Sequence, residues 1–126
     1  MKLRIKGNSL RLRISQTELA QLLRDGTIEE TIHFGMAAEA TLTYGLKHAA
    51  ADRDIGLEYV AQRVTVVLST AAATRWTEGD DVGIYGSCAT GDGALELMLE
   101  KDFACLDRDD PANKDAFPNP KAGAVC

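Results

Sequence analysis

Five cationic side chains within the first fourteen residues are the part of the sequence best suited to chemistry. They alternate with apolar residues on both sides of a Gly-Asn pair at 7–8, and no acid lies among them: Lys2, Arg4, Lys6, Arg11 and Arg13. This period-2 pattern predicts a two-residue β-hairpin in which Gly7 adopts a positive φ. The register sets cation opposite cation on one face, with Arg4 facing Arg11. Such a face requires a source of negative charge.

Two interpretations of this face differ in where the negative charge comes from. In the functional interpretation, the five cations bind a small anion such as a phosphate, a polyphosphate or a nucleotide. In the structural interpretation, the acids belong to the chain itself, because Glu96 and Glu100 alternate with leucines on a strand predicted near 93–102. Pairing of opposite charges across neighbouring strands is common, so the structural interpretation is favoured.

The other candidate sites are weaker. Glu96, Glu100 and Asp102, together with Glu58, could line a pocket and hold magnesium, but nothing in their spacing demands it. The acidic segment 107–115 lacks the glycine and terminal glutamate of a calcium-binding loop and fits a solvated loop better. The three cysteines show no zinc-ligand spacing, and Cys105 is expected to be a buried structural thiol. No catalytic residue is assigned, and no cofactor is expected unless a divalent metal joins the anion.

Local signals predict two helices and eight short strands. Ser15 and Glu18 form a capping box, and Gly26 provides a stop, so a helix is expected over 16–25. The remaining expected elements are strands near 28–34, 40–48, 55–60, 62–69, 81–86 and 93–102 and a helix near 70–77. The Ala61-Gln62 turn is chemically poor, so residues 55–69 could instead be one long bulged strand.

The two halves of the chain follow the same pattern. A shift of 54 positions places Leu12 on Val66 and Leu22 on Trp76, and both halves have a serine at the helix start. This match predicts an internal duplication of a ββαββ unit over 1–48 and 55–102, followed by an extended tail over 103–126. The expected fold is one α+β domain, 1–126, with a predominantly antiparallel sheet that is strongly curved or barrel-like.

Composition narrows the classes of protein to consider. The chain has 126 residues, of which 45% are hydrophobic and 26% charged, as in an ordinary globular domain. Its net charge of −5 argues against binding to duplex nucleic acid. The charged start, the absence of an apolar run of about 20 residues and the odd number of cysteines favour a cytoplasmic protein without a membrane partner. Composition does not decide whether the chain forms a homo-oligomer.

Two stretches, KGNSLRLR over 6–13 and EKDFACLD over 100–107, are followed by DAFPNP over 115–120. Together they resemble a family of short bacterial proteins known only as a domain of unknown function. The resemblance spans nearly the whole chain and implies no activity.

The expected architecture, with its charged strands, also resembles that of the triphosphate-tunnel (CYTH-like) enzymes. These look like duplicated antiparallel barrels in which basic and acidic strands grip a polyphosphate and a divalent metal. The Glu-x-Glu-x-Lys strand of that group is absent here, since positions 2, 4 and 6 hold Lys, Arg and Lys. This departure puts metal-dependent hydrolysis in doubt.

The sequence therefore predicts a small binding or interaction domain without a catalytic site. The alternative is a phosphate- or polyphosphate-binding barrel that acts as a metal-dependent phosphohydrolase of the triphosphate-tunnel type. The two hypotheses differ in whether the hairpin cations face a ligand or acidic residues of the chain itself.

Overall fold

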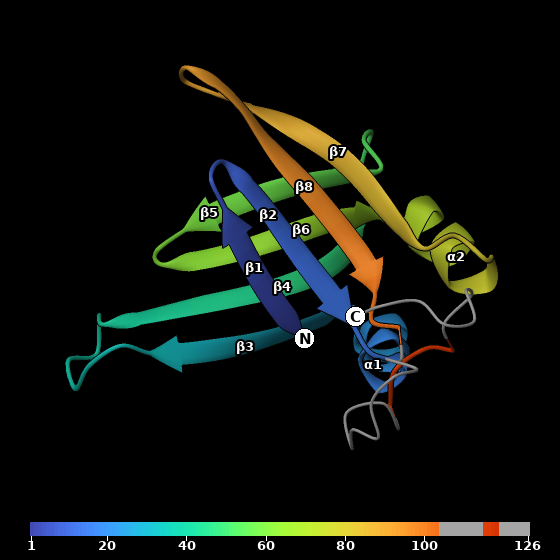
Figure 1. Cartoon of the computed structure of the whole chain (residues 1–126), viewed down its shortest axis with the longest axis horizontal. Coiled ribbons are helices and arrows are strands. Elements are labelled where there is room, and N and C mark those ends of the chain that lie inside the picture. The colour runs from blue at the N-terminus through green and yellow to red at the C-terminus, as the bar shows by residue number, and fades with distance from the viewer. Residues whose placement is uncertain (104–114, 119–126) are drawn as a thin grey trace.

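The computed structural model describes residues 1–103 and 115–118 (Figure 1). The order of elements over the first half, strand–strand–helix–strand–strand, recurs in the second half. The elements are β1 (Lys2–Lys6), β2 (Ser9–Ile14), α1 (Gln16–Asp25), β3 (Thr27–His33), β4 (Thr41–Ala49), β5 (Ile55–Val60), β6 (Arg63–Ser69), α2 (Thr70–Glu78), β7 (Gly83–Thr90) and β8 (Gly93–Lys101). The helices and strands expected from the sequence are all present, with shifts of a few residues at their ends.

The strands form two four-stranded sheets, and each sheet combines one hairpin from each half of the chain. Sheet A has the order β1-β2-β8-β7, and sheet B has the order β3-β4-β6-β5. The strands of every hairpin are antiparallel, whereas the two central pairs that join the halves, β2–β8 and β4–β6, are parallel. The prediction of an α+β fold is therefore confirmed, with two mixed sheets.

The expectation of a barrel is wrong. Sheet A ends at β1 and β7 and sheet B ends at β3 and β5, so the described strands close no barrel, and the sheets are not purely antiparallel. The physical reason is that alternating apolar residues specify each hairpin but not its neighbour. The hairpins meet through parallel pairs, and this leaves four edge strands. The edge strand β1 carries three cations, a feature that discourages further strand pairing.

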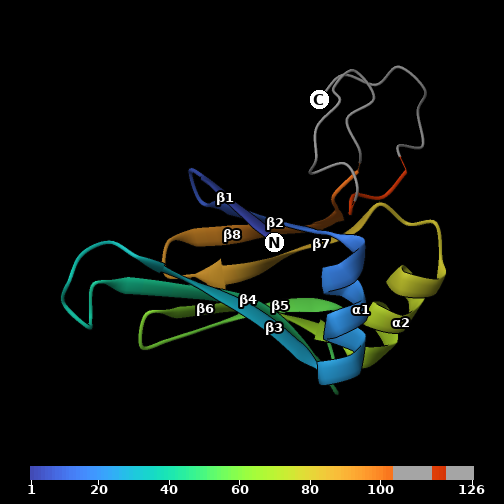
Figure 2. The same ribbon diagram turned by 90° about the horizontal axis from the view of Figure 1, so that it is seen from below.

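The two sheets pack face to face, and both helices cover one end of the sandwich (Figures 1 and 2). Each layer contributes side chains that are at most 2% exposed: Leu12, Leu97 and Leu99 from sheet A, Leu46, Val66 and Leu68 from sheet B, and Leu22 and Trp76 from the helices. On the side where β5 approaches β7, a Cβ at Gly86 would lie 2.5 Å from Ile55 Cγ2, so only glycine allows this close approach. The core lies between the sheets and extends to the helices.

Helix α1 matches the helix expected over 16–25, and the expected capping box is present. Ser15 Oγ accepts a hydrogen bond from the Glu18 amide (3.3 Å), and Glu18 Oε1 accepts one from the Ser15 amide (3.0 Å). Gly26 ends the helix with a φ of 82°. With ten residues in α1 and nine in α2, neither helix described here reaches the length needed to cross a bilayer.

The two tight turns at equivalent places in the sheets differ in strain. Gly7 has a φ of 55°, as the first hairpin requires. Ala61 and Gln62 also have positive φ values, 50° and 63°, although neither is glycine. Residues 55–69 are therefore a hairpin and not one bulged strand. Gln62 holds this turn against β4, since its carbonyl accepts a hydrogen bond from the Thr43 amide (3.0 Å).

Residues 115–118 pack against the start of α1 and the end of β8. Asp115 Oδ1 accepts hydrogen bonds from the Thr17 hydroxyl (2.6 Å) and amide (3.1 Å), which lower the pKa of Asp115 below its ordinary value. Phe117 meets Phe103 edge to face, with ring centroids 6.2 Å apart. The contact between these aromatic rings anchors residues 115–118 beside the end of β8. Cys105 and the acids at 107–110 lie outside the described residues.

Adjacent leucines of α1 provide a direct test of this packing. Leu22 is fully buried, whereas Leu23 is 41% exposed. We expect Leu22→Ala to lower the free energy of unfolding by about 2–5 kcal/mol, because the cavity it leaves lies between sheet and helix. Leu23→Ala, the matched control, should cost less than about 1 kcal/mol. Urea denaturation of both variants measures the difference, and equal losses would contradict the buried face assigned to α1.

Candidate anion-binding site

The five predicted cations share the outer face of the β1–β2 hairpin. Cross-strand partners are Lys2 with Arg13 and Arg4 with Arg11. The alternate residues of β2, among them Leu12, are buried in the core. The period-2 pattern therefore places the apolar side chains inward and all the cations on the side of sheet A that faces away from sheet B.

Strand β8 lies beside β2 and brings acids to part of this face. Arg11 Nε lies 3.1 Å from Glu100 Oε1, and Lys2 Nζ lies 2.8 Å from Asp102 Oδ2. The structural interpretation is therefore correct for these two cations. Glu96, the other expected acid, forms no ion pair within the described part of the chain. It lies beside Ser9 in the register of the two strands.

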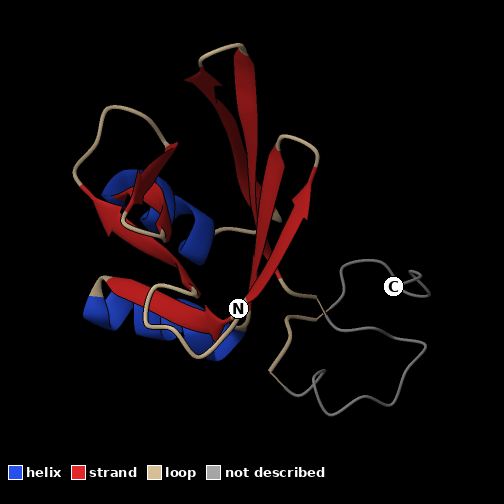
Figure 3. Ribbon diagram, turned by 90° about the vertical axis from the view of Figure 1, so that its left-hand side faces the viewer, coloured by secondary structure: helices blue, strands red, loops and turns tan. Residues whose placement is uncertain are grey.

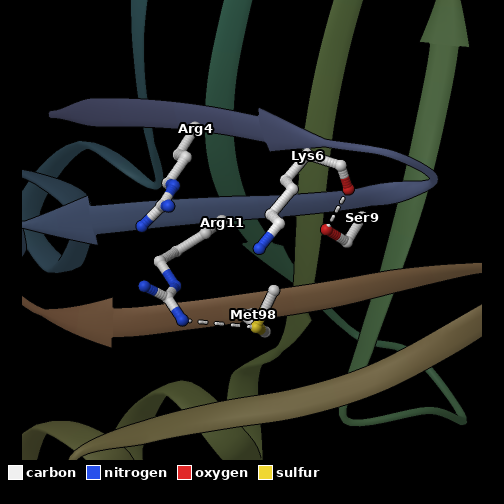
Figure 4. Close-up of a pocket in the computed structure, with 5 residues that line it drawn as sticks. All are labelled: Arg4, Lys6, Ser9, Arg11 and Met98. Carbon is white, nitrogen blue, oxygen red and sulfur yellow. Dashed lines mark hydrogen bonds between the residues drawn. The ribbon is translucent and has the colours of Figure 1, made fainter.

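The remaining cations of the hairpin have no acidic partner among residues 1–103 and 115–118. Two of them, Arg4 and Lys6, extend from β1 toward Arg11 on β2, as Figure 4 shows. Together with Ser9 and Met98 they line a hollow of about 160 Å³. Arg13, the third, is exposed and does not line the hollow. The structure thus divides the predicted array into a paired part and an open part.

Glu100 holds Arg11, one of the residues that line this hollow. Besides its ion pair with Arg11, it accepts a hydrogen bond from the Tyr85 hydroxyl through Oε2 (2.8 Å). Arg11 also donates from Nη2 to Met98 Sδ (3.8 Å). Its Nε is inaccessible to solvent and makes no directed hydrogen bond, so the contact with Glu100 is ionic. Partial burial and the hydrogen bond to Glu100 raise the pKa of Tyr85 to about 12.

The turn that carries Lys6 is held on both sides. Ser9 Oγ donates to the Lys6 carbonyl (2.6 Å), which closes the turn. Asn8 Nδ2 donates to the Ala94 carbonyl (2.8 Å), which ties the tip of the hairpin to β8. Lys6 therefore projects from a backbone with little freedom, although its own side chain is exposed.

The four carboxylates suggested for a metal are not brought together, and Asp102 is paired with Lys2. Glu58 lies on β5 of sheet B and pairs with Lys47 (2.9 Å), whereas Glu96 and Glu100 lie on β8 of sheet A. Within the described ranges no group of three or more histidine, cysteine, aspartate or glutamate side chains is arranged to hold a metal ion. The metal site therefore has no geometric support in this part of the chain.

The equivalent hairpin of sheet B carries no such array. The positions 54 residues after the five cations hold one acid and four uncharged residues: Gly56, Glu58, Val60, Thr65 and Val67. Both hairpins are edge hairpins that pair in parallel with a strand of the other half. The fold consequently tolerates a hairpin without cations in this place, so the cations of the first hairpin are not a requirement of the fold.

Sequence reasoning found the cations and Glu100 but missed three residues of the site. Ser9 and Met98 line the hollow, and Tyr85 supports Glu100. Asp102 is among the carboxylates suggested for a metal, but its partner in the structure is Lys2. A signal for Met98 was available, since it lies between Glu96 and Glu100 on the same strand face. It could be used only with the register of β2 against β8, which the sequence does not contain.

The fold and this face define a small α+β domain of two mixed sheets with a cationic edge hairpin. The chain belongs to a family of unknown function (DUF7009), which it matches over residues 1–121. This membership agrees with the expected family of unknown function. No curated protein and no solved structure matches the chain.

The shifted pKa of Tyr85 predicts a pH dependence. Between pH 10 and about 12 the folded chain keeps the Tyr85 proton while the unfolded chain loses it. The stabilisation is therefore present below pH 10 and is lost as the pH rises toward 12. In a tyrosinate absorbance titration, with Tyr85→Phe used for subtraction, Tyr85 should ionise near pH 12.

Glu100→Gln tests the cause of this shift. It removes the charge that Tyr85 faces, so the pKa of Tyr85 should fall toward 10 without reaching it, because partial burial remains. A wild-type Tyr85 that ionises near pH 10 would contradict the contact.

Proposed function

We propose that the chain is a small binding domain whose ligand is a phosphate-type oxyanion, bound at the outer face of the β1–β2 hairpin. The observation that carries the proposal is the convergence of Arg4, Lys6 and Arg11 on one hollow, with no acid paired to the first two in the described part of the chain. Guanidinium and ammonium groups that line one hollow suit the oxygens of a phosphate group.

The divided roles of the cations support this proposal. Arg11 is held in place by Glu100, so it presents its remaining N–H groups in a fixed orientation. Arg4 and Lys6 are exposed and keep their hydration, which a phosphate can replace. A site that combines one anchored arginine with two accessible cations would lose less side-chain entropy on binding than three mobile side chains would.

The contrast between the two hairpins also supports a ligand. Like charges on adjacent strands destabilise a sheet, and Arg4 lies directly opposite Arg11. In the hairpin of sheet B the corresponding pair is Glu58 with Thr65, which carries no such repulsion. A bound anion would offset the repulsion in the first hairpin, and this explains why the charges occur in one half only.

We further infer that the two halves arose by duplication of a ββαββ unit. Both sheets have the same arrangement, in which an edge hairpin of one half pairs in parallel with the final strand of the other half. The helix caps Ser15 and Ser69 are 54 residues apart, and the buried Leu22 and Trp76 occupy matching helix positions. On this account the cationic face is a feature acquired by one copy of the unit.

Thermal-shift and calorimetric titrations with phosphate, pyrophosphate, triphosphate and nucleotides, with and without magnesium, test the proposal. An anion at 100 times its Kd should add about 2.7 kcal/mol to the stability of the native state. Binding should weaken as ionic strength rises, because the site is open to solvent. We expect Arg4→Ala and Lys6→Ala each to weaken binding at least about tenfold, with little effect on stability.

Arg24→Ala is the matched control, since it removes one exposed positive charge from α1, outside the β1–β2 hairpin. It should leave anion affinity within about twofold of the wild type. Failure to detect binding of any of these anions would overturn the proposal. Equal affinities of wild type and Arg4→Ala would do the same.

A further inference from the structure

The apolar inner face of sheet B extends beyond the cover that sheet A provides. The strands of the two sheets cross, so their inner faces diverge at the end opposite the helices (Figures 2 and 3). There they enclose an open crevice of about 350 Å³. Leu42, Tyr59 and Val64 of sheet B form one wall, and Ile5 and Leu95 of sheet A form the other. None of the residues that line the crevice is charged.

A pair of exposed apolar side chains lies on the same end of the molecule. The β3–β4 hairpin projects past the rest of the sandwich (Figures 1 and 2). Phe34, just beyond β3, is 69% exposed, and Met36 in the connecting turn is fully exposed. Ile32, whose strand partner is Leu42 of the crevice wall, is 45% exposed and links the projection to the crevice. The chain therefore carries an apolar projection beside an apolar crevice.

We propose that a second copy of this chain binds here, with Phe34 and Met36 of each copy seated in the crevice of the other. The resulting homodimer is a property distinct from anion binding, since it uses the crevice between the sheets, although Ser9 in the β1–β2 hairpin borders both the crevice and the hollow of the outer face.

The sizes of the two parts agree. A buried apolar cavity of about 150 Å³ accommodates a benzene ring, so a crevice of about 350 Å³ has room for a phenylalanine ring together with a methionine side chain. The long, unbranched methionine can adapt to an irregular space. Burial of the two side chains would remove from water the two largest exposed apolar groups of the projecting turn.

Because the projection and the crevice lie next to each other at one end of the chain, two copies can form a closed homodimer. A two-fold axis placed between them brings each projection to the opposite crevice at the same time, so both contacts form in one isologous interface. A projection and crevice on opposite ends of the chain would instead generate a fibre. Here both belong to the end away from α1 and α2.

The extent of exposed apolar surface at this end also favours self-association. Arg63 at its edge is paired with Glu29 (2.5 Å), so this cation is not available to a charged partner. Six of the nine large apolar side chains that are exposed among the described residues lie here: Ile5, Ile32, Phe34, Met36, Tyr59 and Val60. Their combined exposed surface is on the order of several hundred Å², compared with about 800 Å² that each partner contributes to a stable interface.

Sedimentation velocity over a wide concentration range tests the proposal. The wild-type chain should sediment as a dimer at high micromolar concentration. The double variant Phe34→Ser/Met36→Ser should be a monomer, with unchanged thermal stability of the fold because both side chains are exposed. Leu23→Ser, which alters an exposed leucine on α1 at the other end, should remain dimeric.

A complementation experiment separates seating in the crevice from general stickiness. Leu42→Trp should fill the crevice and give a second monomeric variant that keeps its projection. A mixture of this variant with Phe34→Ser/Met36→Ser retains one intact projection and one intact crevice. The mixture should therefore form a heterodimer, at least about tenfold weaker than the wild-type dimer, although neither variant associates alone.

Each alternative outcome would overturn the proposal. A wild-type chain that is monomeric at every concentration would exclude the dimer. A dimer that persists in both variants would place the interface elsewhere, and a mixture that fails to associate, with both variants folded, would exclude reciprocal seating. Anion titration of the monomeric variants keeps the two proposals distinct, since binding at the β1–β2 hairpin should persist in them.

Discussion

The parallel pairing of β2 with β8, and of β4 with β6, is the constraint on which the rest of the structure depends. A two-stranded hairpin is marginally stable alone, and each hairpin here gains a neighbour only from the other half of the chain. The two pairings bring Leu12 beside Leu99 and Leu46 beside Val66, all at most 2% exposed, and so create both halves of the core at once. The same step places Glu100 next to the cationic hairpin.

Local interactions explain why so much of this fold follows from the sequence. The capping box at Ser15 and the turn at Gly7 are short-range features, and both are present as expected. Alternation of apolar residues likewise gives the correct inward face of β2. The arrangement of hairpins depends instead on contacts between distant residues, 20 positions apart for Leu46 with Val66 and 87 for Leu12 with Leu99, and no local pattern encodes their direction. The barrel expectation failed at that step.

In the candidate site, too, local patterns predict one part and long-range contacts decide the other. Charge pattern alone identified Lys2, Arg4, Lys6, Arg11 and Arg13, because alternation places them on one face. It could not assign their partners, since the acids that meet Arg11 and Lys2 come from β8 and the residue after it. Register alone does not decide the pairing, because Glu100 lies beside Arg13 in the register of β2 and β8 but forms its ion pair diagonally with Arg11. Glu96 has the same charge and parity but lies beside Ser9, where no cation of β2 stands.

Because each sheet combines one hairpin from each half of the chain, the order of synthesis affects how the structure forms. Sheet A cannot form until β8 is available, although β1 and β2 are made first. The apolar side of the β1–β2 hairpin, which carries a row of leucines, must therefore remain without its packing partners while about 80 further residues are added. A strand pairing over so long a stretch of sequence slows folding. The cations on the other side of that hairpin would keep it soluble and out of unwanted strand pairing while it waits.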